Sequence, residues 1–276
     1  MKRLFRRQTS KSQYVPLRPV RGTQFVDIHC HCLPGLDDGP ETMAEAVSLC
    51  RALQLDGIKT VIATPHQLGQ YDGHNEASVI RQAVSELNEV LKGYCIPINV
   101  LAGADVRIDE RLVRMLDDDL VLTLADGGRY ILLELPHDIF IDISEVLDML
   151  SSRGIKAIIS HPERHRVIAK EPGIISGWLQ KGAILQITAG SLTGDFGTLA
   201  EKTGWHLLDS GVVAVVATDA HNLHNRQPRM FAAYGLIAEH LGKTFARQVC
   251  LDNPMKIRTG DNVRAVTKLM HEERTG

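Results

Sequence analysis

The stretch that decides the fold is Phe25-Val26-Asp27-Ile28-His29-Cys30-His31, an apolar run of strand character that ends in two histidines one residue apart. Residues i and i+2 of an extended chain point to the same side, so His29 and His31 can aim two imidazoles at one point. Converging neutral imidazoles suit a borderline metal ion such as Zn²⁺, Mn²⁺ or Fe²⁺. Taken alone, the pair is more often a chance pair of surface or core histidines.

Six more apolar stretches follow, and helical patterns separate them. We expect strands over residues 25–29, 58–63, 96–102, 130–135, 155–159, 183–188 and 212–217. We expect a helix that begins at Gly39-Pro40, an amphipathic helix over 76–92, further helices over roughly 142–153, 165–181, 197–210 and 228–249, and a last short helix capped by Asn253-Pro254. The strands are nearly continuous apolar runs, which is typical of a parallel sheet covered on both faces.

This alternation predicts an α/β protein, either a (β/α) barrel or a doubly wound sheet. The polar residues collect at the carboxyl ends of many strands, as barrel active sites do. An open sheet would concentrate them at one switch point, so the barrel is favoured.

The charge is unevenly distributed along the 276 residues. The formal net charge is −2, and the basic residues of 1–24 contribute +7, which leaves −9 on the rest. An acidic body argues against a nucleic-acid-binding surface. We expect residues 1–24 to be a flexible basic arm, either a solvated tail or a peripheral contact with an acidic partner or anionic lipid.

The five cysteines include no CxxC pair. Neither a signal peptide nor an 18-residue apolar run is present, so we expect a cytoplasmic protein with no transmembrane segment. No cysteine is followed by Arg at the sixth position, which argues against the Cys-x5-Arg chemistry of cysteine-dependent tyrosine phosphatases. We interpret Cys30 and Cys32 as packing residues rather than metal ligands.

Ligand-type side chains recur at the predicted strand ends. They are His29, His31, His66, Asp105, Glu134, His161, Asp219 and His221, with Asp38 in the loop after the first strand. Each alone would usually be a satisfied polar group. Together they exceed the needs of one ion and suit two or three divalent ions that share bridging carboxylates and lower the pKa of bound water.

Five short motifs contain most of these residues and follow one another along the chain. They are Asp27-Ile28-His29-Cys30-His31, Asp37-Asp38-Gly39-Pro40, Ala63-Thr64-Pro65-His66, Ser160-His161-Pro162-Glu163-Arg164 and Thr218-Asp219-Ala220-His221-Asn222. Over about residues 25–260 the chain resembles the polymerase and histidinol phosphatase (PHP) superfamily. More specifically, it resembles the bacterial manganese-dependent protein-tyrosine phosphatases found with capsule and exopolysaccharide synthesis.

The resemblance implies a single-domain, distorted TIM-like (β/α)₇ barrel over residues 25–260, followed by a polar tail at 261–276. It implies three ions, with Mn as the first candidate and Fe, Zn, Mg or Co as alternatives. By the resemblance, the ligand sets are His29, His31 and Asp219; Glu134 and His161; and Asp38, His66 and His221, with Asp105 bridging the first two ions. The family usually has Glu at position 105. Because the Asp side chain is one methylene shorter, either the backbone approaches the ions more closely or an ion is held less tightly.

Arg164 and Arg226 follow the motif histidines at spacings suited to binding phosphate, which guanidinium holds bidentately. The resemblance supports this role and implies single-step hydrolysis, in which a metal-bridging hydroxide attacks phosphorus in line. Either His221 or metal-bound water could act as general acid. The expected partner is a phosphotyrosine protein, most naturally a bacterial tyrosine kinase of polysaccharide export.

Three alternatives stay open. The first is another PHP phosphoesterase, acting on a small-molecule phosphate or a phosphodiester. The second is a metal-dependent amidohydrolase, which also begins with His-x-His but often carries a bridging lysine where this chain has Glu134. The third is a non-catalytic barrel that binds phosphotyrosine or a kinase. The only sequence feature in its favour is Asp105, at a position where the family usually has Glu.

Overall fold

The structure is a computed structural model that describes residues 24–263. The expected basic arm, apart from Gln24, and the expected tail beyond residue 263 lie outside the described residues. Within residues 24–263, no helix combines the length and apolar character needed to cross a bilayer.

The described residues form two sheets in which every strand pair is parallel. One sheet has the order β1-β2-β4, with strands β1 (Phe25–Cys30), β2 (Ile58–Ala63) and β4 (Asn99–Ala102). The other has the order β3-β5-β6-β7-β8-β9, with strands β3 (His66–Gln67), β5 (Asp105–Arg107), β6 (Tyr130–Glu134), β7 (Lys156–Ile159), β8 (Ile184–Thr188) and β9 (Val213–Ala217). The predicted α/β class with parallel strands is confirmed.

Backbone contacts join the two sheets at β1 and β9. Cys30 and Ala220 form a parallel bridge. The amide of His31 donates to the Ala220 carbonyl at 2.9 Å, and the amide of Asp219 donates to the His29 carbonyl at 2.7 Å. These bonds place His29 and His31 beside the loop that follows β9.

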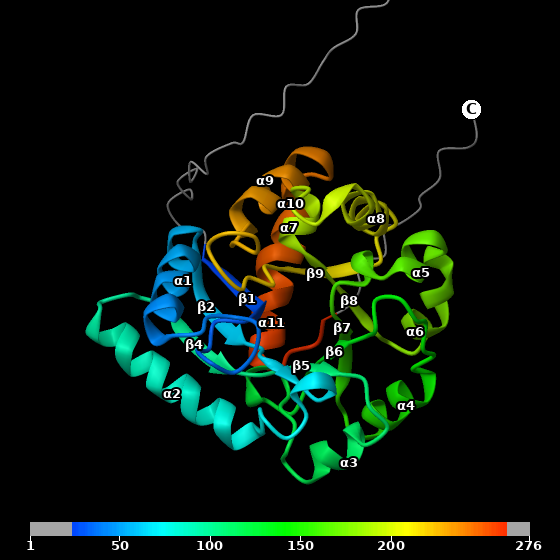
Figure 1. Ribbon diagram of the computed structural model, residues 1–276. Helices are drawn as coiled ribbons and strands as arrows, with labels where there is room; N and C mark the ends of the chain where they lie inside the picture. The colour runs from blue at the N-terminus through cyan, green and yellow to red at the C-terminus, as the bar shows by residue number, and fades with distance from the viewer. Residues whose placement is uncertain (1–23, 264–276) are drawn as a thin grey trace, which may run out of the picture.

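Helices surround the strands, as Figure 1 shows. They are α1 (Met43–Leu55), α2 (Ala77–Gly93), α3 (Leu112–Asp117), α4 (Ser144–Ser152), α5 (Arg166–Lys170), α6 (Ser176–Gln180), α7 (Ala189–Leu192), α8 (Gly197–Asp209), α9 (Met230–His240), α10 (Lys243–Arg247) and α11 (Asn253–Thr259). Shorter turns are η1 (Gly69–Tyr71), η2 (Leu124–Asp126), η3 (Pro162–Arg164), η4 (Pro172–Ile175) and the π-helical η5 (Gln248–Asp252).

Several predicted boundaries were wrong. The first helix does not begin at Pro40; it begins at Met43, because Thr42 and Glu45 form a capping box that satisfies the first-turn amides. The predicted helix over 165–181 is broken into α5, η4 and α6 around Pro172, which cannot donate an amide hydrogen bond. The predicted helix over 228–249 ends at His240, and Gly242 with a φ of 91° precedes α10.

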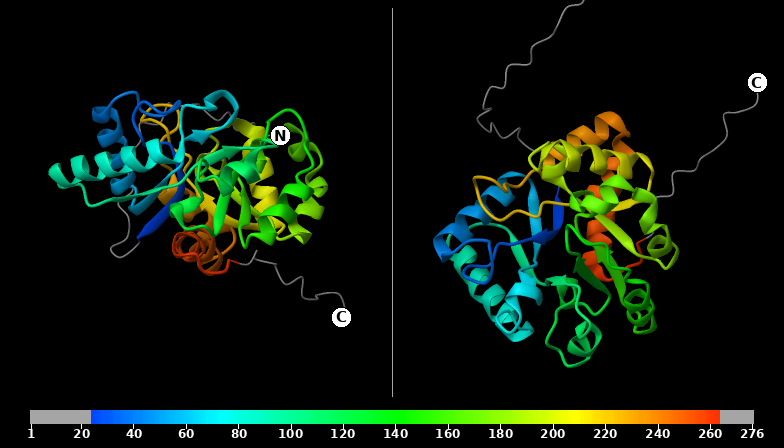
Figure 2. Two further views of the ribbon diagram at one scale, coloured as in Figure 1. Left: turned by 90° about the horizontal axis from the view of Figure 1, so that it is seen from below. Right: turned by 45° about the vertical axis from the view of Figure 1, so that its right-hand side comes forward.

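Apolar residues are buried on both faces of the strands, as the continuous apolar runs predicted. An outer cluster lies between strands and helices, and an inner cluster includes Val26, Leu132, Ile158 and Ile257. Helix α11 supplies Ile257 and lies at the lower edge of the molecule in the left view of Figure 2. It packs against the starts of the strands, where the Asn253 amide donates to the Ala214 carbonyl at 2.8 Å. The opposite, carboxyl ends are therefore left open for a site.

Candidate metal centre

The nine predicted ligand residues all lie around one centre at the carboxyl ends of the strands. Their ligand atoms fall into overlapping groups in which every atom lies within 4.8 Å of the others. These groups include His29 with His31 and Asp219, and Asp38 with His31, His66 and His221. The predicted convergence of the nine side chains is therefore present in the structure, and their roles as ligands remain proposals.

His29 on β1 and His31 just after it are oriented by residues behind them. His29 Nδ1 lies 2.9 Å from Gln186 Oε1, and His31 Nδ1 lies 2.6 Å from Asp37 Oδ2. Since both partners are acceptors, each Nδ1 carries the proton and each Nε2 presents a lone pair. The two Nε2 atoms lie only 3.2 Å apart. Burial lowers the pKa of His29 to about 4 and the pKa of His31 well below its usual value, which keeps both rings neutral.

Asp219 lies between these imidazoles and two guanidinium groups. Its Oδ1 is 3.2 Å from His29 Nε2 and 3.4 Å from His31 Nε2, while its Oδ2 contacts Arg164 and lies 2.7 Å from Arg226 Nη2. Burial alone would raise the pKa of Asp219, but Arg226 and Arg164 outweigh it and hold that pKa well below its usual range. The carboxylate is thus ionised. Asp219 also has a φ of 52°, a conformation that non-glycine residues rarely adopt outside functional sites.

On the outer side of the centre, Asp38 bridges two histidines. Its Oδ1 lies 3.1 Å from His221 Nε2 and 3.5 Å from His66 Nε2. His221 Nδ1 lies 3.0 Å from the Asp219 carbonyl, an acceptor, so its Nε2 also presents a lone pair toward a carboxylate.

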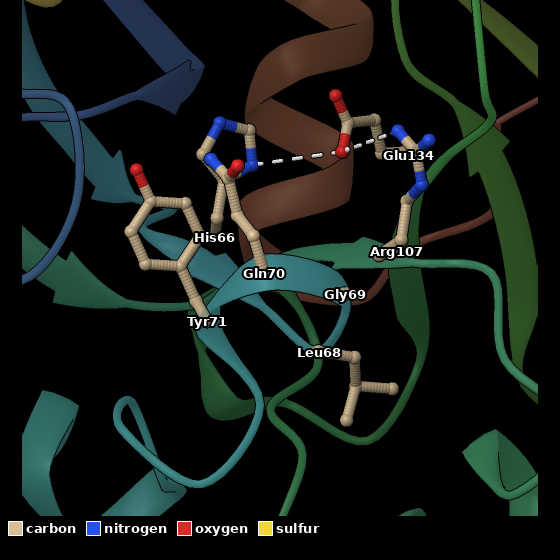
Figure 3. Close-up of a pocket in the computed structure, with 7 residues that line it drawn as sticks. All are labelled: His66, Leu68, Gly69, Gln70, Tyr71, Arg107 and Glu134. Atoms are coloured by element: carbon tan, nitrogen blue, oxygen red, sulfur yellow. Dashed lines mark ion pairs between the residues drawn. The ribbon is translucent and has the colours of Figure 1, made fainter.

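Asp105 occupies the middle of the remaining ligands. Its Oδ2 is 3.5 Å from His29 Nε2, 3.6 Å from His66 Nδ1 and 3.9 Å from His161 Nε2. Burial, with the carboxylates of Glu134 and Asp219, raises the pKa of Asp105 well above its usual value. Figure 3 shows Glu134 facing His66, with Glu134 Oε2 3.7 Å from His66 Nδ1.

A close backbone contact accompanies the short Asp105 side chain. A Cβ added at Gly103 would lie 2.6 Å from Ile62 Cγ2 and 3.4 Å from the Ala63 carbonyl. The chain between β4 and β5 can therefore press against β2 only because residue 103 is glycine.

The structure adds four residues that the sequence reasoning did not assign to the site. Asp37 and Gln186 orient His31 and His29. The possible ligand atoms of His137, Glu134 and His161 lie within 4.8 Å of one another. Arg107 Nη1 lies 3.2 Å from Glu134 Oε2. Asp37 stands within a quoted motif, whereas His137 and Arg107 lie in segments that carry no local signal.

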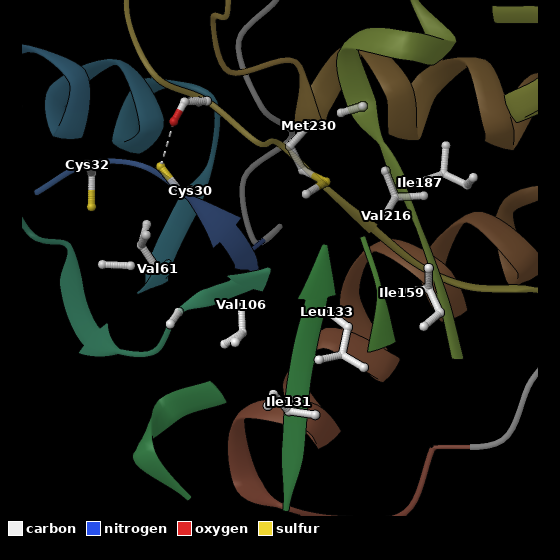
Figure 4. Packing of buried hydrophobic residues seen from close by; sticks show 14 of the residues in the cluster. Cys30, Cys32, Val61, Val106, Ile131, Leu133, Ile159, Ile187, Val216 and Met230 are labelled. Carbon is white, nitrogen blue, oxygen red and sulfur yellow. Dashed lines mark hydrogen bonds between the residues drawn. The ribbon is translucent and has the colours of Figure 1, made fainter. Parts of the chain in front are cut away.

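The cysteines fit the predicted packing role. Cys30 and Cys32 are buried in the outer cluster, and the Cys30 thiol donates to the Ala220 carbonyl at 3.4 Å (Figure 4). Burial raises the pKa of Cys30 to about 11, so it is a thiol rather than a thiolate.

The donor set fits divalent metal ions. Among the described residues, both oxygens of Asp105, Asp219 Oδ1 and His221 Nε2 are buried without a hydrogen-bond partner. Asp105 Oδ2 and Asp219 Oδ1 lie beside imidazole nitrogens, and His221 Nε2 lies beside Asp38 Oδ1. Buried acceptors that face one another are costly unless a cation lies between them. Imidazole nitrogens with carboxylate oxygens suit Mn, Fe or Zn.

Fold and site together define a class: an α/β protein with a cluster of His, Asp and Glu side chains that could hold metal ions and two arginines at its edge. The family described as capsular polysaccharide synthesis, CpsB/CapC, matches residues 25–259. The chain belongs to this family, and the resemblance inferred from its motifs is confirmed.

Named relatives agree with this assignment. The chain is 39% identical over 204 residues to the tyrosine-protein phosphatase YwqE of Bacillus subtilis (strain 168), covering 73% of this chain and 79% of that one. It is 28% identical over 240 residues to the tyrosine-protein phosphatase CpsB of Streptococcus pneumoniae, covering 84% and 98%.

Solved structures point the same way. A structure from a study of YwqE and CpsB, described as unique metal-dependent tyrosine phosphatases, superposes with a TM-score of 0.83 at 31% identity, covering 89% of this chain and all of that one. An amidohydrolase from Mycoplasma synoviae superposes with a TM-score of 0.53 at 12% identity, covering 90% and 89%, which shows a shared fold alone.

Proposed function

We propose that this chain is a metal-dependent protein-tyrosine phosphatase. The observation that carries the proposal is the buried set of opposed acceptors: two imidazole lone pairs 3.2 Å apart that face ionised Asp219, with Arg164 and Arg226 beside it. A cation centre flanked by guanidinium groups matches a dianionic phosphate monoester. The relatives' names support phosphotyrosine as the substrate group.

The proposed ion sets follow the observed groupings. His29, His31 and Asp219 would hold one ion; Glu134 and His161 a second, with His137 in reach; Asp38, His66 and His221 a third; and Asp105 would lie between the first two. Bound divalent ions would lower the pKa of water and neutralise phosphoryl charge, with Mn the first candidate and Fe, Zn, Mg or Co as alternatives.

The two arginines would bind the non-bridging phosphoryl oxygens. Arg164 is held in place by Thr188 Oγ1 at 3.1 Å and by the Phe196 ring, whose centroid lies 4.4 Å from its Cζ. Arg226 is held by Asp38 Oδ2 at 3.3 Å. Positioned charges of this kind stabilise a transition state without reorganisation. The leaving tyrosyl oxygen has a pKa near 10 and needs little protonation, for which His221 is the candidate within the chain.

The finer architecture and the cellular setting complete the proposal. The bridge between β1 and β9 supports reading the two sheets as one distorted (β/α)₇ barrel, a single catalytic domain over residues 25–260. We place the enzyme in the cytoplasm, acting on a bacterial tyrosine kinase of polysaccharide export.

Metal removal and replacement test the activity. Chelation should abolish hydrolysis of p-nitrophenyl phosphate and of a phosphotyrosyl peptide, and Mn²⁺ should restore both in proportion to the metal bound. Histidinol phosphate and a nucleotide phosphodiester serve as rival substrates. Full activity in a strong chelator would overturn the metal mechanism, and a preference for either rival would overturn the substrate assignment.

A further inference from the structure

A cavity of about 260 Å³ opens beside the metal centre on the side of His66 and Glu134. It is lined by His66, Leu68, Gly69, Gln70, Tyr71, Arg107 and Glu134. Figure 3 shows His66, Gln70 and Tyr71 on one side and Glu134 with Arg107 on the other. Since two proposed ligands form part of its wall, a substrate bound at the centre would extend a neighbouring group into this space.

Arg107 is held rigidly at the edge of this cavity. It lies on β5 directly opposite Glu134 of β6, and its Nη1 is 3.2 Å from Glu134 Oε2. The same Nη1 donates to the Leu135 carbonyl at 3.3 Å. The side chain is 32% exposed, so the guanidinium faces solvent as well as the centre.

Part of this guanidinium makes no hydrogen bond. Among residues 24–263, Nη1 donates to the Leu135 carbonyl and pairs with Glu134, whereas Nε and Nη2 of Arg107 form no hydrogen bond. A guanidinium carries five N–H donors in a planar fork that matches carboxylate and phosphate. The unused part of the fork is therefore available to an anion that enters the cavity.

The turn at Leu68 and Gly69, which forms part of the cavity wall, packs against the aliphatic part of the Arg107 side chain. Leu68 has φ 65° and ψ −169°, a region that essentially only glycine adopts, while its side chain is buried. Gly69 follows with φ 58°, and a Cβ there would lie 3.1 Å from Arg107 Cγ. This strained turn brings backbone against the Arg107 stem, which fixes the arginine from a second side.

We propose that Arg107 and this cavity form a subsite for an anionic group of the substrate peptide that flanks the phosphotyrosine. The group is a carboxylate or a second phosphate, since both match the unused part of the fork. The subsite rests on the proposed phosphatase function and makes Arg107 a specificity-determining residue. The competing interpretation is that Arg107 only positions Glu134, which predicts no dependence on the flanking sequence.

Three phosphotyrosyl peptides of equal length separate these interpretations. They carry Glu, Gln or phosphoserine on both sides of one central phosphotyrosine, and p-nitrophenyl phosphate reports the reaction without a flank. For the parent enzyme we expect kcat/KM to be about 10-fold higher for the Glu peptide than for the Gln peptide, since a charge-assisted contact is worth about one factor of ten. The doubly phosphorylated flank shows whether phosphate exceeds carboxylate as the ligand.

The variant Arg107→Gln should reduce the Glu/Gln ratio to about 1, and Arg107→Glu should reverse it in favour of a Lys-flanked peptide. Arg111→Gln is the matched control, because it removes the same charge from an exposed arginine paired with Asp72 and Asp109. It should keep the ratio of the parent. Anisotropy with a non-hydrolysable phosphonate peptide should show the same loss of discrimination in binding.

The outcomes are distinguishable. A parent enzyme that hydrolyses Glu and Gln peptides equally overturns the subsite and leaves the phosphatase function intact. Equal losses on both peptides and on p-nitrophenyl phosphate in Arg107→Gln, with the ratio unchanged, overturn it in favour of a positioning role. Hydrolysis of p-nitrophenyl phosphate without any phosphotyrosyl peptide overturns the proposed function and the subsite together.

Discussion

At the scale of single residues, Asp37 accepts hydrogen bonds from three groups of the site. Its Oδ2 accepts from His31 Nδ1 at 2.6 Å and from the His66 amide at 3.1 Å, and its Oδ1 accepts from the Gly39 amide at 2.9 Å. Partners that orient a ligating histidine commonly change metal affinity 10–100-fold when removed. Asp37 thus fixes both the tautomer of His31 and the loop that carries Asp38.

Asp37→Ala should therefore weaken Mn²⁺ binding by about 10–100-fold, while saturating Mn²⁺ restores much of kcat. Isothermal titration of the metal-free protein measures the affinity directly. Asp118→Ala, at an exposed acid paired with Arg114, is the control and should bind Mn²⁺ like the parent. Parent-like affinity in Asp37→Ala would contradict the orienting role.

Arg164 should act on phosphate rather than on metal. Arg164→Ala should lower kcat/KM for p-nitrophenyl phosphate by about 10²–10³-fold, in the range found when one donor to a transition-state oxyanion is removed. The metal content, measured by mass spectrometry, should stay at the parent level. Arg247→Ala, at an exposed arginine on α10 paired with Asp252, controls for surface charge. Loss of metal from Arg164→Ala would show that the arginine supports the ligands instead.

The ligand residues were predictable, and their supporting residues were not. A histidine or acid that ends an apolar strand stands out locally, as His66, His161 and Asp219 do. Gln186 and Arg107 have no such signal, because their importance comes from contacts with residues 157 and 27 positions away in the chain. Only the folded register brings Arg107 opposite Glu134.

At the scale of elements, a buried carboxyl links β1 to β9 across the two sheets. Asp27 Oδ1 accepts from the Thr218 amide at 2.9 Å, and its Oδ2 accepts from the Thr218 hydroxyl. Burial, only partly opposed by these bonds, raises the pKa of Asp27 from 3.8 to about 7. The folded protein therefore holds a proton that the unfolded chain releases above pH 4.

This proton predicts that the contribution of Asp27 to stability falls as pH rises. Between about pH 4 and 7 the Asp27 carboxyl binds more proton in the folded state than in the unfolded state, so its contribution to the free energy of unfolding should fall by at most about 4 kcal/mol. The lowered pKa of His29 acts in the opposite direction, so the Asp27 contribution is measured as the difference between the parent and Asp27→Asn. Urea unfolding of both proteins in a chelator at pH 5 and pH 7.5 measures this difference, and Asp27→Asn should lose less stability, or gain more, than the parent over this range. An identical pH dependence in parent and variant would contradict the role of Asp27.

The apolar pattern of the sequence did not predict strands β3 and β5, for a physical reason. The third strand was expected over 96–102, but β4 is only Asn99–Ala102 and β5 begins anew at Asp105. The tight approach at Gly103 separates them, and Pro65 likewise separates β2 from β3. Apolar periodicity records the buried runs and carries no information on such interruptions, although these interruptions aim Asp105 and His66 at the centre.

At the scale of the whole molecule, the two ends of the strands differ in what they bury. Helix α11 and the inner apolar cluster occupy the amino ends, whereas the carboxyl ends bury several imidazoles and carboxylates against one another. Burying opposed acceptors destabilises the fold unless cations neutralise them. The fold and the metal centre should therefore depend on each other energetically.

Metal should consequently stabilise the folded protein measurably. Free Mn²⁺ at 100 times its dissociation constant contributes about 2.7 kcal/mol per site, which corresponds to a rise in Tm of about 5–10 °C for a domain of this size. Differential scanning calorimetry of metal-free and Mn²⁺-loaded protein measures the shift. His161→Ala should lose much of it, whereas His206→Ala, an exposed histidine on α8, should keep it. Equal melting temperatures with and without Mn²⁺ would show that the buried acceptors are tolerated by the fold alone, and that the centre does not bind the ion tightly.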